Sequence, residues 1–292
     1  MEQKRLYKKL LLTLTAFLAV FFMTSSAAFA GDNDFKLTRL CGNGLCETNP
    51  TAVSAFKTLS QEVSSLLAPM HFQPASTLGE EGFEIAVESK MSFATEDNAS
   101  WGALNKNNKE TQVNGIKEGD KYAAPDVFAT VQLHMRKGLP FSLEVEGVFN
   151  WLANSEIFYV GAGVRWAPIE GFWYMPDLSI RAHVGTVVGA SELSLINVNM
   201  DIALSYTWGL GGVVAITPYG GYTLLTSWAS SRPLIITHLD GQQEETVFRR
   251  VNHHISRGFI GVQLKGDFFV FAIEGELGSK VSALGLKIGA DF

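Results

Sequence analysis

Charged side chains recur at every second position in several apolar stretches of this chain. The positions that could do chemistry are Glu144, Glu146, Arg165, Arg181, His183, Asp201, Glu274 and Glu276. Side chains alternate across a strand, so a two-residue period puts these groups on one face of extended backbone. Their signs are mixed. Such groups either pair with one another and fill a narrow interior or line a small selective pore, and both readings stay open at this point.

The elements that must position these charges begin at Gly82. From there to Phe292 about ten runs have one apolar and one polar face, as in Phe83, Ile85 and Val87 against Glu84 and Glu88. After residue 30 no stretch of ~18 uncharged apolar residues follows, so a spanning helix is not expected. The pattern predicts an all-β fold, an antiparallel up-and-down β-barrel of about ten strands over residues 81–292, but alternation alone does not say whether the apolar face points into a core or out to lipid. The tryptophans favour lipid outside and hence a transmembrane barrel, because they fall near strand ends, at one rim Trp151 and Trp228 and at the other Trp166, Trp173 and Trp208.

Composition agrees with a packed or membrane-embedded chain. The 292 residues carry 23 Lys and Arg against 29 Asp and Glu, a net charge of −6, and the cations are not clustered. Nucleic acid is therefore not expected as a partner, because affinity for phosphate backbones needs clustered cations. Residues 1–30 combine a cationic start, an apolar run from Leu10 to Met23 and small residues at Ala28 and Ala30. This pattern is typical of a secretory signal peptide.

The closing stretch resembles the last strand of bacterial outer-membrane β-barrels. Leu284, Leu286 and Ile288 alternate with Gly285, Lys287 and Gly289, and the run ends in the aromatic Phe292. The resemblance is to the superfamily and names no specific family. It implies a Gram-negative outer-membrane location, contact with outer-membrane lipid and lipopolysaccharide, and recognition of the last strand by the barrel-assembly machinery. Long connections near 95–126 and 229–256 would then lie outside the cell, and the short turns in the periplasm.

Residues 31–80 differ from the strands that follow. Cys41 and Cys46 surround Gly42-Asn43-Gly44-Leu45 and predict a small disulfide in an oxidising compartment. Asn49 and Pro50 start a predicted helix that ends near Leu67. We interpret this segment as a periplasmic extension that can be separated from the barrel. The alternative is that it plugs the barrel or touches a periplasmic partner.

Enzymes of the outer membrane are the rival class. Omptin-like proteases have ten strands but use Asp-x-Asp or Asp-x-His pairs, which this sequence lacks; His238-Leu239-Asp240 is reversed. His254-Ile255-Ser256 is similar to the His-x-Ser of lipid A deacylases, yet the nearest acid, Glu276, has the opposite strand parity. His253 and His254 with His238 are more simply solvated loop residues than a metal site. We therefore predict no catalytic residue, no metal and no cofactor.

The sequence thus favours an outer-membrane barrel with a structural or surface-interaction role and a lumen largely filled by side chains. A narrow porin-like channel for small solutes is the alternative. An enzyme acting on lipid A or peptides is the second alternative. No ligand can be named, because neither long connection carries a motif with a mechanism.

Overall fold

The structure, a computed structural model, describes residues 31–41, 45–94, 99–104, 125, 127–211, 213–237 and 243–292. The predicted signal peptide, most of the 95–126 connection and His238 to Asp240 lie outside the described residues. None of the described helices is long and apolar enough to cross a bilayer. The helical elements are α2 (Thr38–Cys41), η1 (Cys46–Thr48), α3 (Pro50–Leu67) and η2 (Ala99–Ala103). The strands are β1 (Phe83–Ala94), β2 (Phe128–Leu139), β3 (Leu143–Leu152), β4 (Phe158–Ile169), β5 (Asp177–Val188), β6 (Leu193–Ser205), β7 (Trp208–Leu210), β8 (Val214–Ser231), β9 (Leu234–Thr237), β10 (Gln243–Thr246), β11 (Val251–Gly266), β12 (Phe269–Gly278) and β13 (Val281–Asp291).

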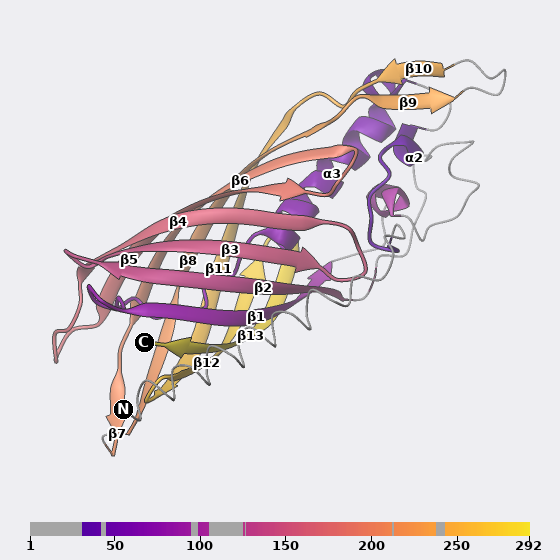
Figure 1. Cartoon of the computed structure of the whole chain (residues 1–292). Coiled ribbons are helices and arrows are strands. Elements are labelled where there is room, and N and C mark those ends of the chain that lie inside the picture. The colour runs from indigo at the N-terminus through magenta and orange to yellow at the C-terminus, as the bar shows by residue number, and fades with distance from the viewer. Residues whose placement is uncertain are drawn as a thin grey trace. The chain divides into compact units, whose positions relative to one another are not determined.

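Ten antiparallel strands close into a barrel in the described part of the chain (Figure 1). The order is β11-β12-β13-β1-β2-β3-β4-β5-β6-β8, and β8 pairs with β11 to complete the ring. The seam between the two chain-terminal strands runs in register from Glu84↔Asp291 to Ala94↔Val281. The predicted fold class is therefore confirmed. The short β7 extends the edge of β8, and β9 and β10 form a separate two-stranded hairpin.

The two ends of the barrel differ in their connections. At the short-turn end, residues 140–142, 170–176, 206–213 and 267–268 link neighbouring strands, and Phe83 and Phe292 exchange backbone hydrogen bonds of 2.9 and 2.8 Å. The long-loop end holds both long connections, between β1 and β2 and between β8 and β11. The second is shorter than predicted, because β8 and β11 continue past the expected boundaries. The early part of β11 is not predicted because its outward residues, such as Asn252 and His254, are polar and do not continue the apolar alternation.

Apolar side chains cover the outer face of the wall. Large hydrophobic residues alternate outward on every wall strand and are exposed, up to 74% for Leu277. Patches this extensive are not found on soluble monomers, whereas a bilayer solvates them. Trp166, Trp173 and Trp208 lie toward the short-turn end, while Trp151 and Trp228 lie toward the long-loop end. This is the interfacial sorting of aromatic residues that membrane barrels use.

Helix α3 lies inside the barrel. Asn49 caps its start, with Oδ1 accepting the amides of Thr51 and Ala52 at 3.1 and 3.3 Å, and Pro50 occupies the first turn. The helix ends at Leu67, and residues 68–82 continue to β1; this second stretch is called the strap. Figure 1 shows α3 among the wall strands, with α2, β9 and β10 near the long-loop end and β7 at the other.

The prediction that residues 31–80 form a separable periplasmic extension is therefore wrong in the location that it gives to the helix and the strap. The predicted helix is present over the expected residues, but its second half, from Leu59 to Leu67, is buried within the wall, while Val53 and Lys57 near its start are exposed. Its outer end packs beneath the long loops, and the strap leads to β1 at the short-turn end. The physical reason is that a ten-stranded ring leaves an interior that its own side chains do not fill.

Candidate functional site

The lumen is the candidate site, because it holds the charged residues of the wall. All eight lumen residues named from the sequence face inward and are at most 6% exposed: Glu144, Glu146, Arg165, Arg181, His183, Asp201, Glu274 and Glu276. They are joined there by Glu84, Glu88, Lys90, His134, Arg136, Arg257 and Lys287, which are equally buried. Burying this many charges is costly unless each finds a partner.

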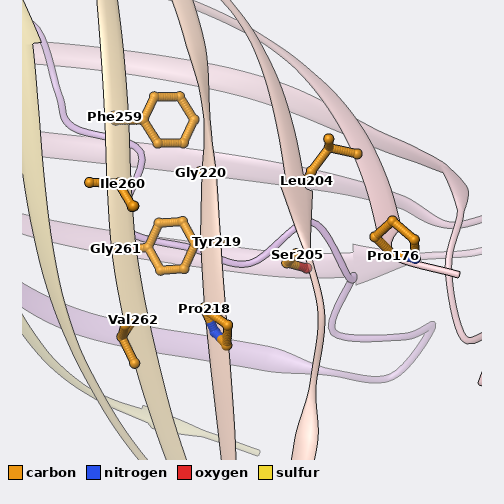
Figure 2. A pocket seen from close by; sticks show the side chains of 10 residues that line it. All are labelled: Pro176, Leu204, Ser205, Pro218, Tyr219, Gly220, Phe259, Ile260, Gly261 and Val262. Atoms are coloured by element: carbon orange, nitrogen blue, oxygen red, sulfur yellow. The ribbon is translucent and has the colours of Figure 1, made fainter.

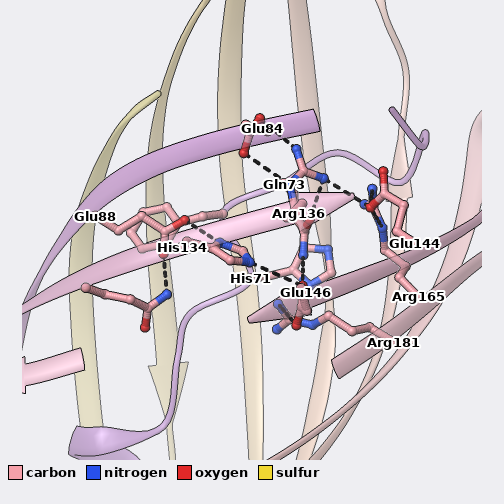
Figure 3. A network of polar contacts seen from close by, with 12 residues as sticks. His71, Gln73, Glu84, Glu88, His134, Arg136, Glu144, Glu146, Arg165 and Arg181 are labelled. Atoms are coloured by element: carbon pink, nitrogen blue, oxygen red, sulfur yellow. Dashed lines mark hydrogen bonds and ion pairs between the residues drawn. The ribbon is translucent and has the colours of Figure 1, made fainter. Parts of the chain in front are cut away.

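Arg136 is the centre of the first group of ion pairs (Figure 3). Its guanidinium donates to both carboxylate oxygens of Glu84, at 3.1 and 2.7 Å, and to Glu144 at 3.2 Å. It also donates to the amide oxygen of Gln73 on the strap at 2.6 Å. Arg165 Nε donates to the same Glu144 at 2.9 Å. Strands β1 to β4 and the strap are thus tied by one network.

A second group surrounds Glu146, deeper along the same wall (Figure 3). Its carboxylate accepts from Gln73 at 3.1 Å and lies 3.4 Å from His134 Nε2 and 3.5 Å from Arg181 Nη1. His134 Nδ1 contacts Glu88 at 2.8 Å, and Arg181 pairs with Asp201 on β6. Glu144 and Glu146 therefore sit in adjoining networks, and Gln73 of the strap touches both.

The strap is held mainly through its backbone. Glu274 accepts the amides of His71 and Phe72 at 2.9 and 2.5 Å, and Glu144 accepts that of Leu78 at 2.5 Å. Glu170 accepts the amide of Thr77 at 2.7 Å. In the other direction, Arg165 donates to the carbonyls of Pro74 and Ser76, and Lys287 to that of Phe72. The lumen charges thus bind backbone groups along the strap.

The helix is held by contacts of the same kind. Lys90 Nζ donates to the carbonyls of Ser65 and Ala68 at 2.9 and 3.0 Å, which satisfies groups that a helix C-terminus leaves open. Nearer the long-loop end, Ser60 Oγ and His253 Nε2 are 2.8 Å apart. Ser64 Oγ donates to Ser227 Oγ at 3.0 Å. Small polar residues on α3 thus meet the polar inner wall.

An apolar cap closes the long-loop end. Phe56 of α3 stacks on Phe248 with ring centroids 4.5 Å apart, and Trp101 stacks on Phe128 at 5.0 Å. These rings belong to one buried cluster with α2, η2 and the ends of the wall strands. Glu192 in the β5–β6 turn accepts the amides of Leu37 and Thr38, and burial raises the pKa of its carboxyl.

The predicted disulfide is confirmed and lies in this cap. Cys41 ends α2, Cys46 begins η1, and the two are bonded. The amide of Cys46 donates to Thr246 Oγ1 at 3.0 Å, which links the disulfide loop to the β9–β10 hairpin. The disulfide loop therefore contacts the β9–β10 hairpin at the long-loop end of the barrel.

The predicted closing strand is β13. Leu284, Leu286 and Ile288 all point outward and are exposed, as alternation requires. Phe292 follows the strand and pairs with Phe83 across the seam. The stretch that resembles an outer-membrane closing strand is therefore the one that closes the ring.

The residues weighed for catalysis do not meet. Ser256 and His254 face outward on β11, whereas Glu276 on β12 is 2% exposed and pairs with Arg257 at 2.9 Å. His253 points inward to Ser60 and so cannot share a site with His254. Among the described residues no group of three or more His, Cys, Asp or Glu side chains could hold a metal ion.

A hollow of about 450 Å³ lies in the wall near the short-turn end of β6, β8 and β11 (Figure 2). Tyr219 and Phe259 line it from the buried side, and Ile260 and Val262 from the lipid-facing side. Ser205 supplies its hydroxyl, which already accepts the amide of Ala75 at 2.9 Å. None of the lining residues is charged, so the hollow offers no acid, base or metal ligand.

What the sequence did not reveal is the strap's part in the site. Gln73 carries no motif, and the backbone groups that the wall binds have no sequence signature at all. The available signal was on α3, where Ser60, Glu62, Ser64 and Ser65 interrupt the side of the helix away from its apolar face. A helix that is buried despite these polar residues must lie against other polar groups. The only buried polar groups that the sequence predicts are the lumen charges.

Comparison with known proteins gives alignments to solved structures alone. No family model and no curated protein sequence matches the chain. Among solved structures, Ail, the attachment invasion locus protein of Yersinia pestis, aligns at 14% identity over 73% of this chain and 99% of its own, with a TM-score of 0.26. The KdgM porin in complex with disordered oligogalacturonate aligns at 5% identity over 72% and 99%, with a TM-score of 0.34. An outer-membrane channel from Pseudomonas putida F1 aligns at 10% identity over 77% and 99%, with a TM-score of 0.33.

The wall itself decides the architecture. Its ring is closed through β8 and β11, its outer face is apolar, its inner face is charged, and its long connections share one end. The chain thus has the fold of the outer-membrane β-barrels, with ten strands and a lumen occupied by its own N-terminal segment.

Proposed function

We propose that the protein is a sealed barrel of the outer membrane that presents its capped long-loop end at the cell surface, in a structural or surface-interaction role. The observation that carries this proposal is the occupied lumen: α3 and the strap run through it and bind the wall along their length. A diffusion pore needs a continuous aqueous path. Helix α3 and the strap, residues 50–82, occupy that path and are together called the plug. Orientation follows the rule that long loops of such barrels face outward.

The strength of the strap contacts supports a resident plug. Glu274, Glu144 and Glu170 accept four backbone amides of the strap. A hydrogen bond to a charged group contributes ~1.5–3 kcal/mol net, so these four together represent roughly 6 kcal/mol or more. At ~1.4 kcal/mol per factor of ten, an open state that breaks all of them would be populated about once in 10⁴ molecules. Spontaneous opening is therefore expected to be rare.

The test is conductance of the purified full-length protein in planar lipid bilayers. We expect a closed baseline under conditions in which a known porin gives stable steps. Glu274→Ala removes the acceptor of two strap amides and should produce brief openings. Glu276→Ala is the matched control, since it lies on the same strand, pairs with Arg257 and has no hydrogen bond to the strap. Stable, charge-selective channels from the wild type would favour the porin-like alternative and reject the sealed barrel.

A further inference from the structure

The stretch that follows the predicted signal peptide lies at the long-loop end of the barrel. The side chain of Asn33 donates to the carbonyl of Ala153 at 2.8 Å, and its backbone amide donates to the carbonyl of Asn154 at 3.1 Å. Asp34 accepts the amide of Glu156 at 2.8 Å. These partners belong to the turn between β3 and β4, which lies at the long-loop end. The stretch is therefore bound to the rim of the wall at that end.

The residues that follow are bound to other connections of the same end. The amide of Lys36 donates to the carbonyl of Ala103 in the β1–β2 connection at 2.8 Å. As described above, the next two amides donate to Glu192 in the β5–β6 turn, and the disulfide loop contacts the β9–β10 hairpin. Residues 31–41 and 45–49 are called the outer segment, and their contacts fix it to the long-loop end.

The other end of the plug reaches the short-turn end. Lys137 Nζ donates to the carbonyls of Glu80 and Glu81 at 3.4 and 2.8 Å. The amide of Gly138 donates to the carbonyl of Gly82 at 2.9 Å, directly before β1. Between these two ends, α3 and the strap lie inside a ring that the pairing of β8 with β11 closes. The chain therefore passes once through the wall, and the outer segment and the start of β1 lie on opposite sides of the membrane.

This path requires the outer segment to cross a membrane. The predicted signal peptide, residues 1–30, would release the segment that follows it into the periplasm. In the orientation given in the proposed function, the long-loop end faces the exterior, and the contacts of the outer segment form only there. We infer that the protein carries its own N-terminal segment across the outer membrane, and that a flexible polypeptide joined to this segment is presented at the cell surface. The inference rests on that orientation, but it does not depend on whether the lumen conducts.

The contacts of the outer segment leave a place for an added polypeptide. Asp32 is exposed at the rim, and the bonds to the β3–β4 turn begin only at Asn33. An insertion between Gly31 and Asp32 breaks the contact of the Gly31 amide with Asp34, at 2.5 Å, and leaves the bonds to the turn in place. In the finished ring α3 occupies the lumen, so the added polypeptide has to cross together with the outer segment, during assembly.

The experiment places a short unstructured epitope between Gly31 and Asp32 of the full-length protein and measures antibody binding to cells. We expect intact cells to bind as much antibody as permeabilised cells do. The matched control has the same epitope between Glu80 and Glu81, which are also exposed but lie at the short-turn end of the same segment. The control should lose its antibody binding on intact cells and regain it after permeabilisation. Heat-modifiability on gels shows that each variant is folded.

Lysine labelling of the unmodified protein answers the same question without an insertion. On intact cells, a membrane-impermeant amine reagent should modify Lys57 on α3 and Lys280 in the β12–β13 turn, which are both exposed. Peptide mass mapping should find Lys265 unmodified, because its side chain, although 44% exposed, lies at the short-turn end.

The three lysines separate the possible failures. Labelling of Lys280 without Lys57, or an epitope beside Asp32 that is detected only after permeabilisation of cells with folded protein, would overturn the inference and leave the orientation of the wall intact. Labelling of Lys265 without Lys280 would invert the wall and reject the surface location in the proposed function as well. Bilayer conductance tests the sealed lumen separately, so the seal and the crossing can fail independently.

Discussion

Replacing Arg136 by Met tests whether the lumen is dry and filled, because Met keeps most of the side-chain length and removes the charge. Arg136 is 3% exposed and donates to Glu84, Glu144 and Gln73. Breaking a buried pair by deleting one partner costs about 3–5 kcal/mol when the other is stranded. Here Glu84 keeps Lys287 at 2.6 Å and Glu144 keeps Arg165 at 2.9 Å, so we expect the lower end, about 3 kcal/mol.

The assay is urea unfolding of the refolded protein in phospholipid vesicles, followed by tryptophan fluorescence. Lys265→Met is the reference, since it breaks the Lys265–Asp291 pair of 2.5 Å, whose lysine is nearly half exposed. A pair screened by solvent contributes ~1 kcal/mol or less. If Arg136→Met lowers the free energy of unfolding no more than Lys265→Met does, water already reaches Arg136, and the argument from a filled lumen is refuted.

Three other expectations concern the ends of the plug and the seam. Asp32→Cys should react with a membrane-impermeant maleimide on intact cells and Glu80→Cys should not, because these two exposed acidic positions lie at opposite ends of the same segment; the reverse labelling would invert the orientation. Cys41 and Cys46 should resist alkylation in unfolded protein until a reductant is added, and a free thiol by mass analysis would contradict the disulfide. Deleting Phe292 should remove two backbone hydrogen bonds to Phe83 and reduce the heat-modifiable fraction on gels, whereas unchanged assembly would show that the seam does not need them.

The wall could be predicted from the sequence because its signal is local. Alternation of Phe83, Ile85 and Val87 with charged neighbours fixes which face each residue takes, and register then brings charges on adjacent strands together. The ion pair of Glu144 with Arg165 follows directly, since the two are cross-strand partners on β3 and β4. The same reasoning separates Ser256 from Glu276, which the structure keeps on opposite faces of the wall.

The plug could not be placed by such reasoning, because its position depends on distant contacts. The pattern of α3 predicts a helix with an apolar face, but the partners of that face, such as Phe248, lie far along the chain. The strap presents backbone amides to Glu274, and backbone groups are the same in every sequence. Gln73 could be recognised only after the wall had been built around it. The local sequence pattern therefore predicts the barrel wall, whereas the position of the segment inside it depends on three-dimensional contacts.

The seam between β1 and β13 also bears on the order of events during folding. These strands hold residues from opposite ends of the barrel sequence, so their pairing closes the longest loop in the wall and is expected to be slow. Residues 45–82 lead directly into β1 and include the helix α3 and the strap, and the disulfide loop precedes the helix at the end far from β1. Passing that assembly through a finished ring lined with charges would be difficult. We therefore expect the N-terminal segment to take its position first. The sheet would then close around it, and the pairing of β1 with β13 would come last.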